Sequence, residues 1–173
     1  MKDEVYEKIY SNLDECITEV LNLCCQYAND GVEKGYGGPF GAAVIIKRKD
    51  KKYQIVSIAR NTTLKDVDPT AHAEVNAIRE ACKKLNRLML KDCILVSSAR
   101  SCPMCLSAAC WSRIPVIKYV LDYDSATNSG FIDNDIFMHL NGKKKIISEE
   151  KISGNCANNP FDAWNNKKDK TIY

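Results

Sequence analysis

Two short motifs bring together residue types that bind a soft metal ion. The first is His72-Ala73-Glu74, and the second, which begins thirty residues after His72, is Cys102-Pro103-Met104-Cys105. One imidazole and two thiolates are ligands that zinc prefers. A structural zinc site is normally closed by four protein ligands, whereas three ligands leave a position for water. The two motifs therefore predict a catalytic site with one zinc ion per subunit.

Glu74 stands two residues after the candidate histidine ligand. Bound zinc lowers the pKa of its water toward ~7, and a carboxylate at this position could take the released proton and pass it to a leaving group. Pro103 predicts a helix that begins at the second motif, where the helix N-terminus would stabilise thiolate anions. Each motif alone is more often an ordinary core histidine or a pair of buried cysteines. Together they match the general pattern of zinc nucleobase deaminases.

The whole chain has the composition of one folded domain. Its 173 residues are 45% hydrophobic and 27% charged, so we expect a single domain over residues 1–173. The net charge of +3 is too even to indicate a nucleic-acid partner by itself. No apolar run approaches the ~20 residues of a membrane span, and the N-terminus lacks the profile of a secretory signal. Nine cysteines, an odd number, argue against a disulfide scaffold. We therefore predict a cytoplasmic protein with no membrane partner.

The elements that must position the motifs follow from the hydrophobic periodicity. Apolar residues at three- and four-residue steps predict an N-terminal helix over residues 1–30 and another helix over 73–85. Strands are predicted at 42–46, 53–58, 93–96 and 116–121, with a helix beginning at Pro103. This order predicts an α/β fold, a three-layer α/β/α sandwich with a mixed central sheet. Farther along, the pattern predicts a helix at 131–140, a short edge strand at 143–152 and a helix at 158–164.

These motifs resemble the cytidine deaminase-like superfamily and, within it, the bacterial guanine deaminases. The resemblance extends over roughly residues 28–173. The segments that carry it are Gly37–Ala42, Asp68–Val75, Cys102–Leu106, Gly130-Phe131 and Pro160–Trp164. The resemblance implies a cytidine deaminase-like fold, His72, Cys102 and Cys105 as zinc ligands, and Glu74 as the catalytic proton shuttle.

The resemblance also implies a substrate pocket and a dimer. The residues that match substrate-binding positions are Phe40, Asn61, Ala71, Asp133, Trp164 and Tyr173. A carboxylate at Asp133 suits guanine, which presents N–H donors. The implied partner is a second copy of the chain, with the C-terminal segment of about 156–173 swapped over the partner's active site.

The resemblance implies zinc-dependent hydrolytic deamination of guanine to xanthine and ammonia. Deamination of adenosine in transfer RNA is an alternative, because those enzymes share the zinc pattern and basic residues occur at Lys143–Lys145, Lys167, Lys168 and Lys170. Such runs are more often solvated surface, and the even charge balance argues against a nucleic-acid partner. Deamination of cytosine or guanosine, and a non-catalytic zinc-bearing binding subunit, are further alternatives.

One segment departs from the family pattern. Members usually carry Cys-Glu-Pro directly before the Cys-Pro-Met-Cys run, whereas this chain has Ala99-Arg100-Ser101. Arg100 thus replaces a carboxylate close to the zinc ligands. The change puts the rate or the specificity in question, while all three ligands and Glu74 are retained.

Overall fold

A five-stranded mixed sheet forms the centre of the protein. The computed structural model describes residues 4–131, 133–151 and 160–169. The strands are β1 (Ile9–Tyr10), β2 (Gly41–Lys47), β3 (Tyr53–Arg60), β4 (Cys93–Ala99) and β5 (Val116–Leu121), in the spatial order β1-β3-β2-β4-β5. Strands β4 and β5 are parallel, and the other pairs are antiparallel. The mixed sheet predicted from the sequence is confirmed.

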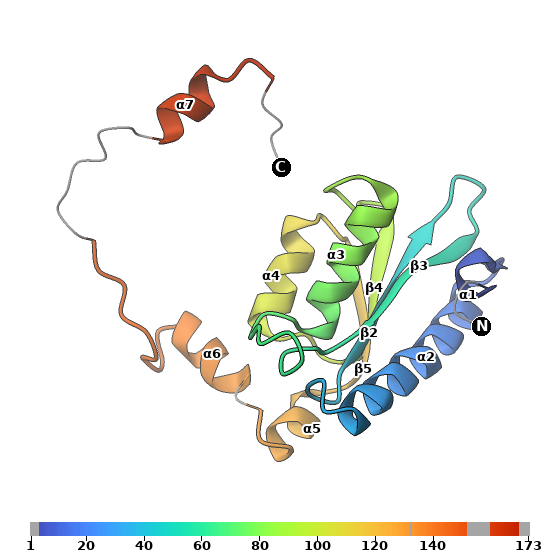
Figure 1. The fold of residues 1–173 in the computed structure, drawn as a ribbon, viewed down its shortest axis with the longest axis horizontal. Coiled ribbons are helices and arrows are strands. Elements are labelled where there is room, and N and C mark those ends of the chain that lie inside the picture. Colours follow the sequence, from blue (N-terminus) through green and yellow to red (C-terminus); the bar gives the residue numbers. More distant parts are fainter. Residues whose placement is uncertain (1–3, 132, 152–159, 170–173) are drawn as a thin grey trace.

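Helices cover both faces of this sheet. Helix α2 (Leu13–Glu33) packs on one face against β2, β3 and β4, whereas α3 (Ala73–Leu85) and α4 (Pro103–Trp111) lie side by side on the other (Figure 1). Successive residues of β2 serve the two layers because side chains alternate along a strand. Ala42 and Val44 belong to the core beneath α3, and Ala43 and Ile45 to the core beneath α2. The predicted three-layer sandwich is confirmed.

The N-terminal segment differs from the single helix predicted over residues 1–30. It forms α1 (Glu4–Glu7), the short strand β1 and then α2, which begins only at Leu13. The side chain of Asn12 caps α2, since its Oδ1 accepts a hydrogen bond of 2.7 Å from the backbone N–H of Asp14. Tyr10 is buried and pairs with Tyr53 of β3. The apolar period continued through this break, so periodicity alone did not reveal it.

Residues 122–151 and 160–169 form what we call the C-terminal extension. Its helices are α5 (Tyr123–Asn128), α6 (Asp133–Leu140) and α7 (Pro160–Asn166), and α7 lies apart from the sheet (Figure 1). Helices were predicted near α6 and α7. The edge strand predicted at 143–152 is wrong, because the described residues 143–151 form no strand and their side chains, including those of Ile146 and Ile147, are exposed. Among the described residues, no helix is both long and apolar enough to cross a membrane.

Candidate metal centre and active site

Two helix N-termini position the zinc ligands. His72 is the N-cap of α3 and Cys102 is the N-cap of α4, and both have extended backbone angles, with φ of -68° and -67°. Cys105 follows one turn inside α4, after Pro103 in its first turn. Because α3 and α4 pack side by side, their N-termini meet, and the three ligand side chains converge.

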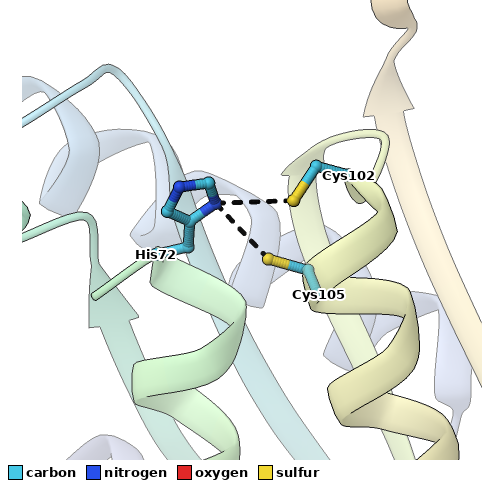
Figure 2. Close-up of side chains that lie close together, drawn as sticks. All are labelled: His72, Cys102 and Cys105. Atoms are coloured by element: carbon cyan, nitrogen blue, oxygen red, sulfur yellow. Dashed lines mark hydrogen bonds between the residues drawn. The ribbon is translucent and has the colours of Figure 1, made fainter. Parts of the chain in front are cut away.

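The three ligand atoms have the spacing of a tetrahedral zinc site. His72 Nδ1 lies 3.6 Å from the Sγ of Cys102 and 3.5 Å from the Sγ of Cys105 (Figure 2). All three atoms lie within 4.8 Å of one another. Zinc with Zn–N and Zn–S bonds of about 2.0 and 2.3 Å places nitrogen and sulfur ligands about 3.6 Å apart. The residues therefore fit a zinc ion held by His72 Nδ1 and two thiolates.

The pKa values of the two ligand thiols are shifted in opposite directions. A hydrogen bond with Cys105 lowers the pKa of the Cys102 thiol to about 4, and the same contact raises the pKa of Cys105. The shifts have opposite signs because one sulfur donates and the other accepts. The hydrogen bond with Cys102 is also the main reason that the pKa of His72 is raised. Because zinc binds thiolates and a neutral imidazole, metal uptake releases protons from these residues.

Glu74 lies in the first turn of α3, beside this centre. Only 5% of its surface is exposed, and it lines the same cavity as His72 and Cys102. Burial raises the pKa of its carboxyl group above the ordinary 4.5, the nearby Cys102 thiolate raises it further, and His72 opposes the shift. A buried carboxyl with a raised pKa can accept and return a proton near neutral pH.

A cavity beside the metal centre is lined by residues from two regions of the chain. Most of them come from what we call the sheet body, residues 4–121, and two of them, Phe131 and Asp133, come from the C-terminal extension. The lining residues are Gly38, Phe40, Asn61, Thr63, His72, Glu74, Arg100, Cys102, Phe131 and Asp133. Three residues expected to contact substrate, Phe40, Asn61 and Asp133, are therefore brought together.

Asn61 is held in one orientation at the end of β3. Its Oδ1 accepts hydrogen bonds from the backbone N–H of Thr63 at 3.1 Å and from the Thr63 hydroxyl at 2.8 Å. A backbone N–H can only donate, so the oxygen of the amide must face Thr63 and its NH₂ group is left to donate to a ligand. The backbone of Asn61 is fixed as well, because its N–H donates to the carbonyl oxygen of Phe40 at 3.0 Å.

Phe131 and Asp133 are the contribution of the C-terminal extension. The Phe131 ring meets Phe40 edge to face, with centroids 4.8 Å apart. Gly38 permits this contact, since a Cβ on Gly38 would stand 3.0 Å from both rings. Asp133 is the first residue of α6, and burial, followed by the charge of Cys102, raises the pKa of its carboxyl group.

Two other expected substrate contacts, Ala71 and Trp164, do not line this cavity within one chain. Ala71 is buried next to the histidine ligand, and its carbonyl accepts hydrogen bonds from Thr62 and Asn76. Trp164 lies on α7, away from the sheet (Figure 1), so its contact across a dimer stays a prediction. Tyr173 lies outside the described residues.

Two residues of the cavity lining are not predicted as binding residues from the sequence. The first is Thr63, although a threonine two residues after an asparagine is a pattern for the side-chain turn that fixes Asn61. The second is Arg100, which the sequence shows only as a departure from the family pattern and which the structure places in the cavity lining.

Comparisons with known proteins agree with this centre. Residues 14–121 match the family described as the cytidine and deoxycytidylate deaminase zinc-binding region. The guanine deaminase of Bacillus subtilis is 35% identical over 164 residues, which cover 94% of this chain and 99% of that protein. The transfer-RNA-specific adenosine deaminase of Aquifex aeolicus is 39% identical over 99 residues, which cover 57% of this chain and 62% of that protein.

Solved structures give the same picture. The crystal structure of the Bacillus subtilis guanine deaminase aligns with a TM-score of 0.79 and 36% identity over 90% of this chain and 98% of that chain. The guanine deaminase of Nitrosomonas europaea aligns with a TM-score of 0.60 and 26% identity over 73% of this chain and 68% of that chain. A structure in complex with 8-azaguanine aligns with a TM-score of 0.62 at 25% identity over 73% of this chain and 68% of that chain. This chain is a zinc-binding deaminase and belongs to the cytidine deaminase-like superfamily that includes these proteins.

Proposed function

We propose that this protein hydrolyses guanine to xanthine and ammonia. The observation that carries the proposal is the pairing of two carboxylates, Glu74 and Asp133, in one cavity with a three-ligand zinc centre. The similarity to the Bacillus subtilis guanine deaminase extends over nearly the whole chain, including the segment that supplies Asp133. Relatives that deaminate other bases share the zinc centre, so pocket residues must set the choice of base.

The cavity has donors and acceptors that complement guanine. The N1–H and N2–H groups of guanine are donors, and an ionised Asp133 accepts from them. The Asn61 amide donates to an acceptor atom on the other edge of the ring, because its oxygen is already held by Thr63. Phe40 and Phe131 offer aromatic surfaces for the purine ring. We assign these residues to base binding.

Glu74 moves the protons of the reaction. His72, Cys102 and Cys105 would hold zinc, which when bound supplies an acidified water and a Lewis acid next to C2 of the base. Glu74 takes one proton of the attacking water and delivers it to the ring nitrogen N3. Glu74 then takes the remaining proton from the new hydroxyl on C2 and passes it to the departing amine. The C2–O bond forms, the C2–N bond breaks, and ammonia leaves. Burial keeps this proton exchange away from bulk water.

We also propose a homodimer in a reducing compartment such as the cytoplasm. The described part of the chain holds eight free cysteines, as expected where disulfides do not persist. A dimer is supported by the exposed apolar side chains of β5, which include Val116, Tyr119, Val120 and Leu121. A swapped C-terminal segment over the partner's cavity would place Trp164 near the base. Light scattering that gives a monomer would remove this part of the proposal.

The alternatives have less support. Two of the basic side chains that would favour RNA are paired with acids, since Lys144 bonds to Asp135 and Lys167 bonds to Asp169. A binding subunit without catalysis would have no use for the buried Glu74 beside the zinc ligands.

A parallel assay separates these functions. Zinc-loaded protein is offered guanine, guanosine, cytosine, adenine and an RNA anticodon stem-loop, with release of ammonia as the signal and Glu74→Gln as the matched variant. We expect release from guanine, with a loss of about 10²- to 10⁴-fold in Glu74→Gln at unchanged zinc content. Release from another substrate but not from guanine, or an active Glu74→Gln protein, would refute the proposal.

A further inference from the structure

Arg100 is the arginine among the residues that line the base-binding cavity. Arg100 is the first residue after β4. Its backbone is held in place because its N–H donates a hydrogen bond of 2.8 Å to the carbonyl oxygen of Leu121 in β5. Its side chain is 46% exposed, which places part of it at the mouth of the cavity rather than in the core. The proposed function leaves this cation without a role.

Neighbouring side chains orient the guanidinium group. Its Nη1 donates a hydrogen bond of 3.2 Å to Oδ1 of Asp122. The guanidinium carbon lies 4.5 Å from the ring centroid of Tyr123 and 5.9 Å from that of Tyr119. The Tyr123 ring is held in turn by its hydroxyl, which donates to the carbonyl oxygen of Ser101 at 2.8 Å. Among the described residues the guanidinium makes one hydrogen bond, so Nε and Nη2 are left as donors for a ligand.

Arg100 and Asp133 line the cavity from two different elements. Arg100 directly follows β4, and Asp133 is the first residue of α6. The two elements are connected through Tyr123 of α5, because the Arg100 guanidinium lies against the Tyr123 ring and α5 packs against α6. The cavity thus presents an acceptor at Asp133 and a donor at Arg100.

Guanine presents both kinds of partner along one edge. The donors N2–H and N1–H are followed by the acceptors O6 and N7, and a guanidinium binds O6 and N7 with two hydrogen bonds. If Asp133 accepts from N1–H, the neighbouring O6 is left to a donor of the cavity lining, and Arg100 has donors to offer. We propose, resting on the proposed function, that Arg100 is a specificity-determining residue that binds the 6-oxo group of the purine. It makes the cavity selective for 6-oxopurines over purines that lack this acceptor.

The test compares two bases that differ at position 6. Guanine carries the 6-oxo group, whereas 2-aminopurine, which is fluorescent, lacks it and also lacks the proton on N1. Each variant is therefore compared with the parent protein for the same base, so that the difference at N1 cancels. Binding of 2-aminopurine and its displacement by guanine are measured on the zinc-loaded full chain in a Glu74→Gln background, where turnover is slowed about 10²- to 10⁴-fold. Arg100→Ala and Arg100→Lys are compared with Lys118→Ala, which removes an exposed cation of β5 outside the cavity lining.

We expect Arg100→Ala to weaken guanine binding about 5- to 150-fold and to weaken 2-aminopurine binding by a clearly smaller factor, because 2-aminopurine offers only N7 to the guanidinium. Arg100→Lys should retain part of the preference for guanine over 2-aminopurine, because the lysine ammonium keeps the positive charge but cannot donate two parallel hydrogen bonds as a guanidinium does. Lys118→Ala should bind both bases like the parent protein. Equal losses for the two bases in Arg100→Ala would overturn the inference, since they would indicate a general change in the loop. The proposed function is judged separately, by xanthine formation in the chain that retains Glu74.

Discussion

The sheet body, residues 4–121, and the C-terminal extension are built in different ways. Every residue of the extension except Ala126 is at least partly exposed among those that the structure describes, whereas the body holds two continuous apolar cores. The match to the deaminase zinc-binding family ends at residue 121, where β5 ends. The region that matches the family therefore lies within the body and includes the metal centre.

The difference places the chemistry in the body alone, whereas base binding draws on both regions, because Asn61 and Arg100 belong to the body and Asp133 to the extension. The zinc ligands and Glu74 come from helices anchored on the sheet, and a rigid scaffold holds such a site to within fractions of an ångström. Phe131 and Asp133 come from the extension, which lies beyond the residues that match the zinc-binding family. On this view the body determines that the protein deaminates, and the extension helps to determine which base is deaminated.

The largest effect should come from removing a ligand in the body. Cys105→Ser should lower zinc affinity by about 100-fold or more. Loss of a residue that only hydrogen-bonds to a ligand typically lowers metal affinity about 10- to 100-fold, and loss of a ligand itself should exceed this. Deaminase activity should fall to the background rate as the zinc dissociates. Cys110→Ser is the matched control, since Cys110 is exposed and lies farther along the same helix. Metal analysis by mass spectrometry that finds one zinc per chain in Cys105→Ser would contradict the ligand assignment.

Stability should also divide between the two regions. Leu95, in β4, is fully buried, and Leu95→Ala should lower the free energy of unfolding by about 2–5 kcal/mol. Leu140, at the end of α6, is 66% exposed, and Leu140→Ala should change it by less than about 0.5 kcal/mol. Urea unfolding followed by circular dichroism gives both values. A large loss in Leu140→Ala would show that the extension packs against a partner, and this would sharpen the proposal of a dimer.

Asp133→Asn tests the contribution of the extension to binding. Loss of a hydrogen bond between a charged acceptor and guanine should lower kcat/KM about 10- to 150-fold, while the zinc content is retained. Asp135→Asn removes a carboxylate from the same helix that pairs with Lys144 and does not line the cavity, so its kcat/KM should match the parent protein. Steady-state kinetics with guanine give kcat/KM for both variants. If both variants behaved alike, Asp133 would have no special role.

The smallest effect is expected at Thr63. Thr63→Val removes the hydroxyl that donates to Asn61 Oδ1 at 2.8 Å but keeps the backbone hydrogen bond. The loss of one neutral hydrogen bond should raise KM for guanine about 2- to 10-fold, with kcat nearly unchanged. Thr70→Val, at a hydroxyl that bonds to Asp68 outside the cavity, is the control. A KM equal to that of the parent protein would mean that the backbone contact alone orients Asn61.

The sequence predicted the body better than the extension for a physical reason. Buried strands and the helix beginning at Pro103 have strong apolar patterns, and the zinc ligands stand at positions where two helices begin. The extension has few buried side chains, so the apolar pattern at Ile146 and Ile147 indicated a strand that does not form. The break before α2 depends on one capping residue, Asn12, within an otherwise continuous apolar period.

The residues that line the cavity were also predicted only in part from the sequence. Phe40, Asn61 and Asp133 were expected from the resemblance, and all three line the cavity. The comparison with the family placed Arg100 close to the zinc ligands, but it did not indicate where an arginine side chain would lie, because relatives usually carry a carboxylate at this position. Its location depends on the pairing of its backbone with Leu121 and on its contact with Asp122, which are features of the folded chain.

The central claim is that a zinc ion held by the body drives deamination of guanine, and titration of metal-free protein with zinc tests it most directly. Xanthine formed from guanine is measured at each ratio of zinc to chain. We predict that activity rises in proportion to bound zinc and levels off at one zinc per chain. Full activity in the metal-free protein, or one bound zinc per chain without xanthine, would contradict the claim.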